Sequence, residues 1–496
     1  MSAPPDPELC YHALKAHDRR FDGVFFVGVT STGIYCRPVC TARVPKRENC
    51  RFFHHAAGAE AMGFRPCLRC RPELAPGLSN SDATASVDAI DRLSHAALQQ
   101  IELGALSDGE SLESLAEDLG VSSRHLRRAV QQSFGVSPIE LAQTHRLLMA
   151  KRLLTETSLS VTEVALASGF RSLRRFNALF QTRYGLNPTG LRKGVSAGQK
   201  TDGDLLLLTL SYRPPLAWRV LLAYLKRRAI PGVELVTDTH YARTVSIGDC
   251  RGWVRVSHLE SIHALEVELS SSLLPVLPKV LGRIRQVFDL DANPEMIAAH
   301  FSGDRLLGPM VQREPGLRVP GAFDGFETAL RTILGQQVTV AAATTMMARL
   351  NAAFVEPAST PIPELNRWPL RAGRIASLQM DDLGRLGVIR QRSACILALA
   401  AEVVSKKVRL APGLHAAQTM SRLLDIPGIG AWTVEYLSMR VLRWPDAFPA
   451  SDLGVRMALG RITAKEAEKR SSAWRPWRAY AVQHLWHSLE TTKISS

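Results

Sequence analysis

Two pairs of closely spaced cysteines constrain the fold of this chain more than any other feature. Cys36 and Cys40 are separated by three residues, and Cys67 and Cys70, separated by two, follow at about 30 residues. Each short spacing lets one loop present two sulfurs to one ion, which is typical of tetrahedral zinc sites. A set of buried or oxidising thiols is the alternative. Because so short a segment has little core of its own, the pattern predicts an N-terminal domain stabilised by zinc.

The rest of the composition is typical of a folded intracellular protein. The other four of the eight cysteines are scattered singly, unlike a secreted disulfide framework. No stretch reaches the roughly 18 apolar residues of a membrane span, and no signal-peptide pattern begins the chain. We therefore expect a cytoplasmic protein without membrane contact. The net charge of +15 indicates a polyanionic partner, although ribosomal or anionic-membrane association would fit the charge alone equally well.

The length of 496 residues exceeds what one hydrophobic core organises, and changes in sequence character divide the chain into four domains. We predict a multidomain, mainly α protein with α+β parts. The expected domains are a small zinc-bound α/β domain at 1–76, an all-α domain at 85–193, an α+β domain at 203–292 and a second all-α domain at 293–496. Polar segments at 76–86 and 194–203 are typical of linkers.

The second domain contains an internal repeat. Residues 116–121 (AEDLGV) recur as 165–170 (ALASGF), and residues 134–138 (FGVSP) recur as 184–188 (YGLNP). Each copy combines an apolar helical face, a glycine turn, a second helix and a Gly-x-x-Pro stop, which together predict a helix-turn-helix. The second helices are expected at about 123–134 and 172–184.

This repeat is strongly basic. Residues 121–193 contain 12 Lys and Arg against 3 acidic residues, whereas a helical bundle without an anionic partner would mix the signs. The doubled helix-turn-helix resembles the AraC-type transcription activators, which place two recognition helices in successive major grooves of double-stranded DNA. An activator of this type implies RNA polymerase as a further partner. The resemblance also implies that base edges and phosphates are contacted by exposed arginines, here Arg124, Arg127, Arg171, Arg174 and Arg175.

The surroundings of the cysteine pairs carry a second resemblance. Residues 31–40 (STGIYCRPVC) and 63–67 (GFRPC) closely resemble the N-terminal domain of the Ada-type alkylation sensors, in which one cysteine accepts a methyl group from a methylated DNA phosphate. The resemblance implies that Cys36 is the acceptor and that Cys40, Cys67 and Cys70 complete one Zn2+ site. It implies phosphate contacts from Thr32, Thr41, Arg43 and Arg65. A zinc-stabilised DNA-binding module without methyl transfer is the alternative.

The last third of the chain has a helical pattern and a Pro-Gly-x-Gly hairpin. Apolar residues at i, i+3, i+4 spacing occur in 323–350, 393–404, 431–442 and 475–489. In residues 423–433 (LLDIPGIGAWT), the backbone N–H groups around Gly428 and Gly430 can receive a DNA phosphate, although such a turn is also an ordinary helix connection. Asp452 follows 22 residues after Gly430, where a lone aspartate is usually a helix cap.

The hairpin and Asp452 together resemble the helix-hairpin-helix DNA glycosylases, and the Trp-rich ending at 474–486 narrows the resemblance to the 3-methyladenine glycosylase II group. The resemblance implies an enzyme that flips an alkylated base out of the duplex and hydrolyses its glycosidic bond. Asp452 would be the carboxylate that stabilises the sugar cation or orients water. The base pocket would be walled by Trp432, Tyr436 and Trp486, with Gln336 and Gln337 in the region that fills the vacated stack.

Departures from these families sharpen the prediction. Superfamily members that also cut the strand have a lysine where Trp432 stands, so we expect a monofunctional glycosylase. The iron–sulfur cluster of some relatives is excluded because Cys395 is the only cysteine after Cys250. Ada proteins commonly end in a Pro-Cys-His-Arg domain that repairs O6-methylguanine, and this chain has no such motif.

The favoured prediction is a bifunctional adaptive-response protein, which senses methylphosphotriesters, activates transcription and excises alkylated bases such as 3-methyladenine. We expect it to be monomeric, because the doubled helix-turn-helix already supplies two groove readers, and to associate with the nucleoid. The alternative is a transcription regulator whose C-terminal domain binds DNA without catalysis.

Overall fold

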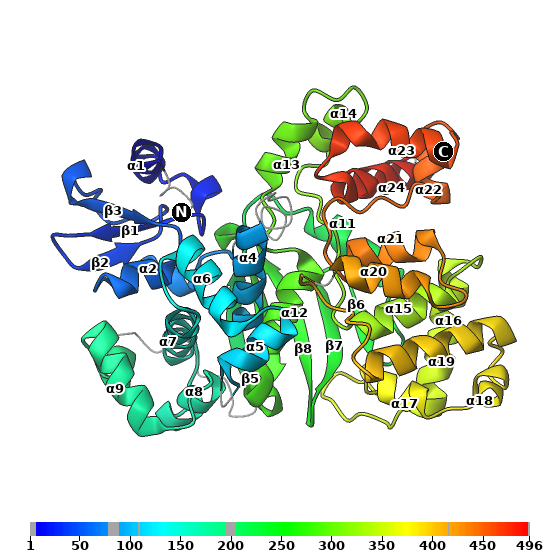
Figure 1. The fold of residues 1–496 in the computed structure, drawn as a ribbon, viewed down its shortest axis with the longest axis horizontal. Helices are drawn as coiled ribbons and strands as arrows, with labels where there is room; N and C mark the ends of the chain where they lie inside the picture. The colour runs from blue at the N-terminus through cyan, green and yellow to red at the C-terminus, as the bar shows by residue number, and fades with distance from the viewer. Residues whose placement is uncertain (1–5, 78–88, 108–109, 194–204, 415, 495–496) are drawn as a thin grey trace. The chain divides into compact units, whose positions relative to one another are not determined.

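The computed structural model describes residues 6–77, 89–107, 110–193, 205–414 and 416–494 (Figure 1). The chain forms two compact units, one of residues 1–214 with 259–282 and the other of residues 215–258 with 283–496. Of the two predicted linkers, 194–203 and nearly all of 76–86 lie outside the described residues. Within the described ranges, no helix has the length and apolar character needed to cross a membrane.

The first unit begins with a small mixed domain built on a four-stranded sheet of order β3-β1-β2-β4. Strand β1 pairs antiparallel with β2 and β3, and β2 pairs parallel with β4. Phe25, Val27 and Tyr35 are fully buried in it, so aromatic side chains provide much of the core. The elements are α1 (Pro7–Lys15), β1 (Phe26–Val29), β2 (Ile34–Cys36), β3 (Cys50–Phe53), α2 (Ala56–Ala61), β4 (Arg65–Pro66) and the 3-10 turns η1 (Arg19–Phe21), η2 (Arg47–Asn49) and η3 (Pro72–Leu74).

The next elements confirm the doubled helix-turn-helix. Ser122 caps the second helix of the first copy by accepting from the backbone N–H of His125, and Ser172 does the same for Arg175 in the second copy. Both helices end at a glycine in the left-handed conformation, Gly135 and Gly185, which glycine adopts readily because it has no β-carbon. The helices are α4 (Ala89–Glu102), α5 (Leu112–Asp118), α6 (Ser123–Phe134), α7 (Pro138–Glu156), α8 (Val161–Ala167), α9 (Leu173–Tyr184) and α10 (Pro188–Lys193).

The region expected to be an α+β domain contains five strands between residues 205 and 270. In the first unit β5 (Leu205–Ser211) pairs antiparallel with β9 (Ala264–Ser270), and the 3-10 turn η5 (Ser271–Val276) follows. In the second unit β6 (Glu234–Val236), β7 (His240–Ile247) and β8 (Cys250–Leu259) form an antiparallel meander after α11 (Trp218–Lys226). The 3-10 turn η4 (Glu260–Ile262) links β8 to β9, and the chain passes between the units again within α12 (Leu277–Phe288).

The remaining helices of the second unit pack around two apolar cores. One core contains Leu330, Ile396 and Leu437, and the other contains Phe301 and Trp474. Helix α21 contributes side chains to both, which places it at the junction of two helical layers. The helices are α13 (Pro294–Phe301), α14 (Leu307–Arg313), α15 (Gly325–Leu334), α16 (Val340–Phe354), α17 (Ala372–Ala376), α18 (Met380–Gly384), α19 (Arg390–Val404), α20 (Ala416–Leu424), α21 (Ala431–Arg440), α22 (Leu453–Ala458), α23 (Ala464–Ser471), α24 (Arg478–Ile494) and the 3-10 turn η6 (Ser472–Trp474).

The helical spacing of 323–350 corresponds to two helices, α15 and α16, separated by residues 335–339. Gln337 in this break has a φ of 56°. That left-handed conformation is incompatible with a continuous right-handed helix.

Candidate functional site

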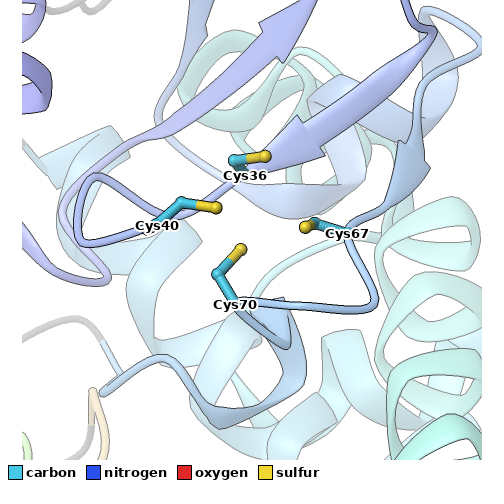
Figure 2. A group of neighbouring side chains, drawn as sticks. All are labelled: Cys36, Cys40, Cys67 and Cys70. Carbon is cyan, nitrogen blue, oxygen red and sulfur yellow. The ribbon is translucent and has the colours of Figure 1, made fainter. Parts of the chain in front are cut away.

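The four cysteines of the N-terminal domain form one cluster. Cys36 ends β2, Cys40 lies in the turn after it, and Cys67 and Cys70 follow β4; their sulfur atoms face one another and all lie within 4.8 Å of one another (Figure 2). Two backbone hydrogen bonds set this arrangement, from Cys40 N to Arg37 O at 3.1 Å and from Cys67 N to Tyr35 O at 3.0 Å. Four converging sulfurs match the tetrahedral thiolate site that zinc prefers.

Arg37 stabilises the cluster through its contacts with Cys70. Its backbone N–H donates to Cys70 Sγ at 3.4 Å, its Nη1 donates to Cys70 O at 3.1 Å, and its guanidinium forms an ion pair with Asp22. An N–H donated to sulfur favours the thiolate, since it stabilises the negative charge. The solitary Cys10 is the contrasting case, because burial raises the pKa of its thiol to about 12.

The four thiols differ in exposure. Cys40 and Cys67 are buried, with exposed fractions of 4% and 8%, whereas Cys36 and Cys70 are half-buried. The residues predicted to contact phosphate are all exposed; they are Thr32, Thr41, Arg43 and Arg65. Among the described residues, no ion pair includes either of the two arginines. The domain surface therefore carries exposed positive charge from Arg43 and Arg65, and Cys36 is one of the two less buried thiols.

A buried polar network joins the cysteine domain to α7. Lys151 of α7 is 1% exposed, forms an ion pair with Glu73 and donates to Cys67 O at 3.4 Å. Glu60 accepts from Thr144 Oγ1 of α7 at 2.9 Å and from Tyr35 Oη at 3.1 Å. Burial raises the pKa of Glu60 to about 7. The network fixes the cluster on the helix that connects the two helix-turn-helix copies.

The arginines predicted for groove contact lie on the outer side of the repeat. Each helix buries its opposite side, through Leu126 and Val130 in α6 and through Phe176 and Phe180 in α9. Amphipathic helices of this kind present a basic surface while they pack against the domain core. The exposed arginines are Arg124 and Arg127 on α6, Arg171 just before α9, and Arg174 and Arg175 on α9.

In the second unit, Asp452 is held by two tryptophans. It is the N-cap of α22, and its Oδ1 accepts from Val455 N at 2.9 Å and from Trp486 Nε1 at 2.9 Å. Its Oδ2 accepts from Trp432 Nε1 at 2.9 Å. The helix-cap interpretation and the catalytic interpretation of Asp452 are therefore compatible, because the cap bond and the two indoles orient one carboxylate that also faces a cavity.

That cavity has a volume of about 600 Å³. Its walls come from the 335–339 break, the start of α19, the hairpin before α21 and the loop before α22. Of the three predicted pocket residues, Trp432 lines it, whereas Tyr436 and Trp486 lie behind. The Tyr436 ring stacks on Trp432 with 5.5 Å between centroids and lies 6.2 Å from Trp486. The lining includes Gln336, Gln337, Gly428, Gly430, Trp432 and Asp452.

Gln336, in the break between α15 and α16, forms hydrogen bonds with the hairpin and with the start of α21. Its Nε2 donates to Gly428 O and to Thr433 Oγ1, each at 3.0 Å. Gly428 has a φ of 95°, and a β-carbon there would lie 3.2 Å from the β-carbon of Cys395, so the turn requires glycine. Gln337 is exposed at the edge of the cavity. It stays a prediction that this side chain enters the duplex.

Four family models match the chain in succession: the metal binding domain of Ada at 9–73, a helix-turn-helix domain at 115–194, the AlkA N-terminal domain at 207–324 and the HhH-GPD superfamily of base excision DNA repair proteins at 330–476. A Mycobacterium tuberculosis protein named probable bifunctional transcriptional activator/DNA repair enzyme AlkA is 36% identical over 98% of this chain and 97% of its own length. The chain belongs to this bifunctional activator/repair family.

Two Escherichia coli relatives each match only part of this chain. DNA-3-methyladenine glycosylase 2 is 32% identical over 57% of this chain and 97% of its own length. The bifunctional transcriptional activator/DNA repair enzyme Ada is 35% identical over 32% of this chain, and the match spans 42% of that relative. Together with the cluster geometry, the Ada metal-domain match assigns one zinc site to Cys36, Cys40, Cys67 and Cys70.

Some functional contacts in this family member escaped the sequence reasoning. The Lys151–Glu73 pair spans 78 residues, and the indole–carboxylate bonds span 20 and 34 residues. No local periodicity of the sequence marks any of these contacts. The one available signal was chemical, since a buried tryptophan N–H needs an acceptor and Asp452 was already a candidate carboxylate.

Proposed function

We propose that the chain is a methylphosphotriester sensor and transcription activator joined to a monofunctional alkylbase DNA glycosylase. The sensor proposal rests above all on the four sulfurs within 4.8 Å of one another, and the glycosylase proposal on Asp452 held between two indoles at a cavity. The proposed partner is double-stranded DNA, with RNA polymerase engaged at promoters, and the proposed state is a monomer.

In the sensor, Cys36 is proposed as the methyl acceptor. Zinc, when bound, keeps the cysteine sulfurs as thiolates at neutral pH. Cys36 Sγ attacks the methyl carbon of the phosphotriester, a sulfur–carbon bond forms, the carbon–oxygen bond breaks, and the phosphate diester leaves with the electron pair. Exposure favours Cys36 over the buried Cys40 and Cys67, and the N–H that Arg37 donates to Cys70 Sγ engages the other half-buried thiol.

Mass spectrometry tests this assignment. After exposure to methylated DNA, one added methyl group is expected on Cys36 and none on Cys10, which serves as an internal control because its thiol is buried and protonated. A methyl group on Cys70 instead would contradict the exposure argument. An unmodified chain that has retained its zinc would favour the alternative, a DNA-binding module without methyl transfer.

Methyl transfer is proposed to switch DNA binding by charge. Four thiolates on Zn2+ carry a charge of about −2, and methylation of one leaves about −1, so repulsion from nearby DNA phosphates falls. The exposed arginines of α6 and α9 supply the attraction. The affinity of methylated and unmethylated protein for operator DNA, compared across a salt series, measures the effect. Equal affinity at every salt concentration would exclude the charge mechanism.

In the glycosylase, Asp452 is proposed to stabilise the positive sugar that develops as the alkylated base leaves. The base already carries a positive charge, so it needs little protonation to depart. Trp432, with electron-rich indole faces, lines the cavity where such a base would stack. No lysine stands at this position, so water is the nucleophile and the strand is left intact.

Release of 3-methyladenine from methylated DNA tests this half. We expect the wild type to release the base and Asp452→Asn, which keeps the shape of the carboxylate, to be at least about 100-fold slower. Borohydride trapping should yield no covalent enzyme–DNA product. A wild type that binds DNA without releasing the base would favour the second candidate, a regulator whose C-terminal domain only binds.

A further inference from the structure

Arg440, at the end of α21, is a buried cation that has no carboxylate partner among the described residues. It is 5% exposed, and none of the ion pairs within 4.0 Å in the described residues includes it. Its guanidinium donates to two backbone carbonyls, Pro320 O and Gly321 O, and to two phenol oxygens, Tyr224 Oη at 2.7 Å and Tyr436 Oη at 2.8 Å. A buried charge that is hydrogen-bonded but not neutralised is costly, so a compensating negative charge is expected nearby.

Other cations face the same two phenols. Arg228, which follows α11, lies with its Cζ 3.8 Å from the ring centroid of Tyr224. Arg331 of α15 is half-buried, and its Nε has no hydrogen-bond partner among the described residues. Both contribute positive potential at the Tyr436 hydroxyl. Three guanidiniums therefore surround a pair of phenols.

Three carboxylates of the same region have other partners. Glu327 accepts from Arg243 Nη2 at 2.7 Å, and Glu234 accepts from Tyr241 Oη at 2.6 Å and from Arg243 Nη1 at 3.4 Å. Asp324 caps α15 and lies 3.6 Å from Arg283. These three acids face five guanidiniums, those of Arg243 and Arg283 together with the three around the phenols, so positive charge remains that a phenol can balance.

Of the two phenols, Tyr436 is the one that ionises. Burial alone would raise the pKa of Tyr436, but the charges of Arg440, Arg228 and Arg331 and the hydrogen bond from Tyr224 outweigh it and lower the pKa to about 7. Burial raises the pKa of Tyr224, so we assign the shared proton to Tyr224 in its 3.3 Å hydroxyl–hydroxyl contact with Tyr436. One proton is thus lost from the pair near neutral pH.

The position of Tyr436 connects this charge to the base pocket. Its ring stacks on Trp432 with the planes 20° apart, and Trp432 lines the cavity. Without a negative charge at Tyr436, one buried and two half-buried guanidiniums would lie behind the wall that receives a positively charged base. A phenolate there reduces the net positive charge by one and makes the wall more favourable to a cation.

We propose that Tyr436 is a phenolate counterion of Arg440 and a specificity-determining residue that favours cationic over neutral bases in the cavity. The selectivity rests on the proposed glycosylase function. The counterion role is independent of it, because it follows from the hydrogen bonds and charges around Arg440.

Ionisation is tested by NMR on the full-length protein with 13C at the ζ carbon of tyrosine. One of the eight tyrosine signals is expected to titrate with a midpoint near pH 7 and to be missing in Tyr436→Phe. The matched control Tyr224→Phe should keep a titrating signal, because Arg440 still faces Tyr436. The counterion role is overturned if every tyrosine signal in the wild type titrates above about pH 9, near the value of free tyrosine.

Selectivity is tested by single-turnover release of 3-methyladenine, a fixed cation, and of hypoxanthine, a neutral base. We expect the rate ratio of the cationic to the neutral base to fall about tenfold in Tyr436→Phe. In the wild type the ratio should rise between pH 6 and pH 8, and in the variant it should stay flat. An unchanged ratio beside a confirmed titration overturns the specificity role. Absence of base release by the wild type would instead count against the glycosylase proposal, and the NMR result would still stand.

Discussion

Two buried cations, one in each unit, are neutralised in different ways. Lys151 in the first unit meets the carboxylate of Glu73, and both side chains are 1% exposed. Arg440 in the second unit meets two phenols and no carboxylate among the described residues. A carboxylate supplies a charge that persists across the physiological pH range, whereas a phenol supplies one that appears only on titration. The first arrangement is suited to a fixed junction and the second to an adjustable pocket wall.

The tryptophans allow each cation to be probed separately. All eight lie between residues 218 and 486, within the second unit, and the first unit contains none. Tryptophan fluorescence in urea therefore reports the second unit, while release of zinc to a chromogenic chelator reports the first. The following predictions use these two signals.

The largest effect is expected from breaking the Lys151 pair. Lys151→Met leaves Glu73 buried beside Arg71 alone, which should lower the free energy of unfolding of the first unit by about 3–5 kcal/mol. Zinc release in urea measures the loss. The double variant Lys151→Met with Glu73→Leu should recover most of it. The matched control is Lys46→Met in the exposed Lys46–Glu48 pair, which should change little; an equal loss in both would show that burial of the pair does not matter.

A smaller loss is expected from removing the phenol that faces Arg440. Tyr436→Phe keeps the ring and its stacking on Trp432 but leaves the guanidinium with one phenol and two carbonyls. The free energy of unfolding of the second unit should fall by about 2–3 kcal/mol at pH 9, measured by tryptophan fluorescence. Tyr224→Phe, which removes the protonated member of the pair, should cost less. The reverse order would assign the charge to Tyr224.

The two cations should also differ in pH dependence. The pKa of Tyr436 is about 7 in the folded chain and lies below its unfolded value, so ionisation stabilises the fold. That contribution is complete above about pH 10 and disappears as the pH falls to about 7. Subtracting the pH profile of Tyr436→Phe from that of the wild type isolates it. A flat difference between pH 7 and 10 would contradict the phenolate.

The smallest effect is expected at Glu60, beside the Lys151 network. Its pKa is raised to about 7 by burial, so folding favours the neutral acid, and stability falls as the pH rises from about 4.5 to about 7. Glu60→Gln mimics the neutral form and should gain about 1 kcal/mol at pH 8 relative to the wild type. Zinc release at pH 6 and pH 8 measures this. The gain should be smaller at pH 6.

Sequence reasoning succeeded where the determinants are local. The C-x3-C and C-x2-C spacings and the Gly stops at 135 and 185 each act within one or two turns of chain, and the family comparisons agree with the resulting zinc and helix-turn-helix domains. The domain boundaries stay predictions.

Sequence reasoning failed where contacts between distant segments of the chain determine the structure. The break at 335–339 has local signals, Gly335 as the C-cap of α15 and Thr339 as the N-cap of α16. The hydrogen bonds from Gln336 to Gly428 and Thr433, 92 and 97 residues away, have none. Charge counting likewise gave the sign of the basic domain but not which cations are buried. Lys151 was one of the 12 basic residues counted as a DNA-facing excess, yet it faces Glu73.

Helix α21 places Trp432, Tyr436 and Arg440 at intervals of four residues, which aligns them along one side of the helix. Trp432, which lines the cavity, and Arg440, which carries the charge balanced by Tyr436, are thus about two helical turns apart. An engineer who wishes to retune which lesions are removed need not alter the surface that touches the base. Substitutions at the far end of the helix, or among the guanidiniums around it, offer a separate handle that leaves the shape of the cavity intact.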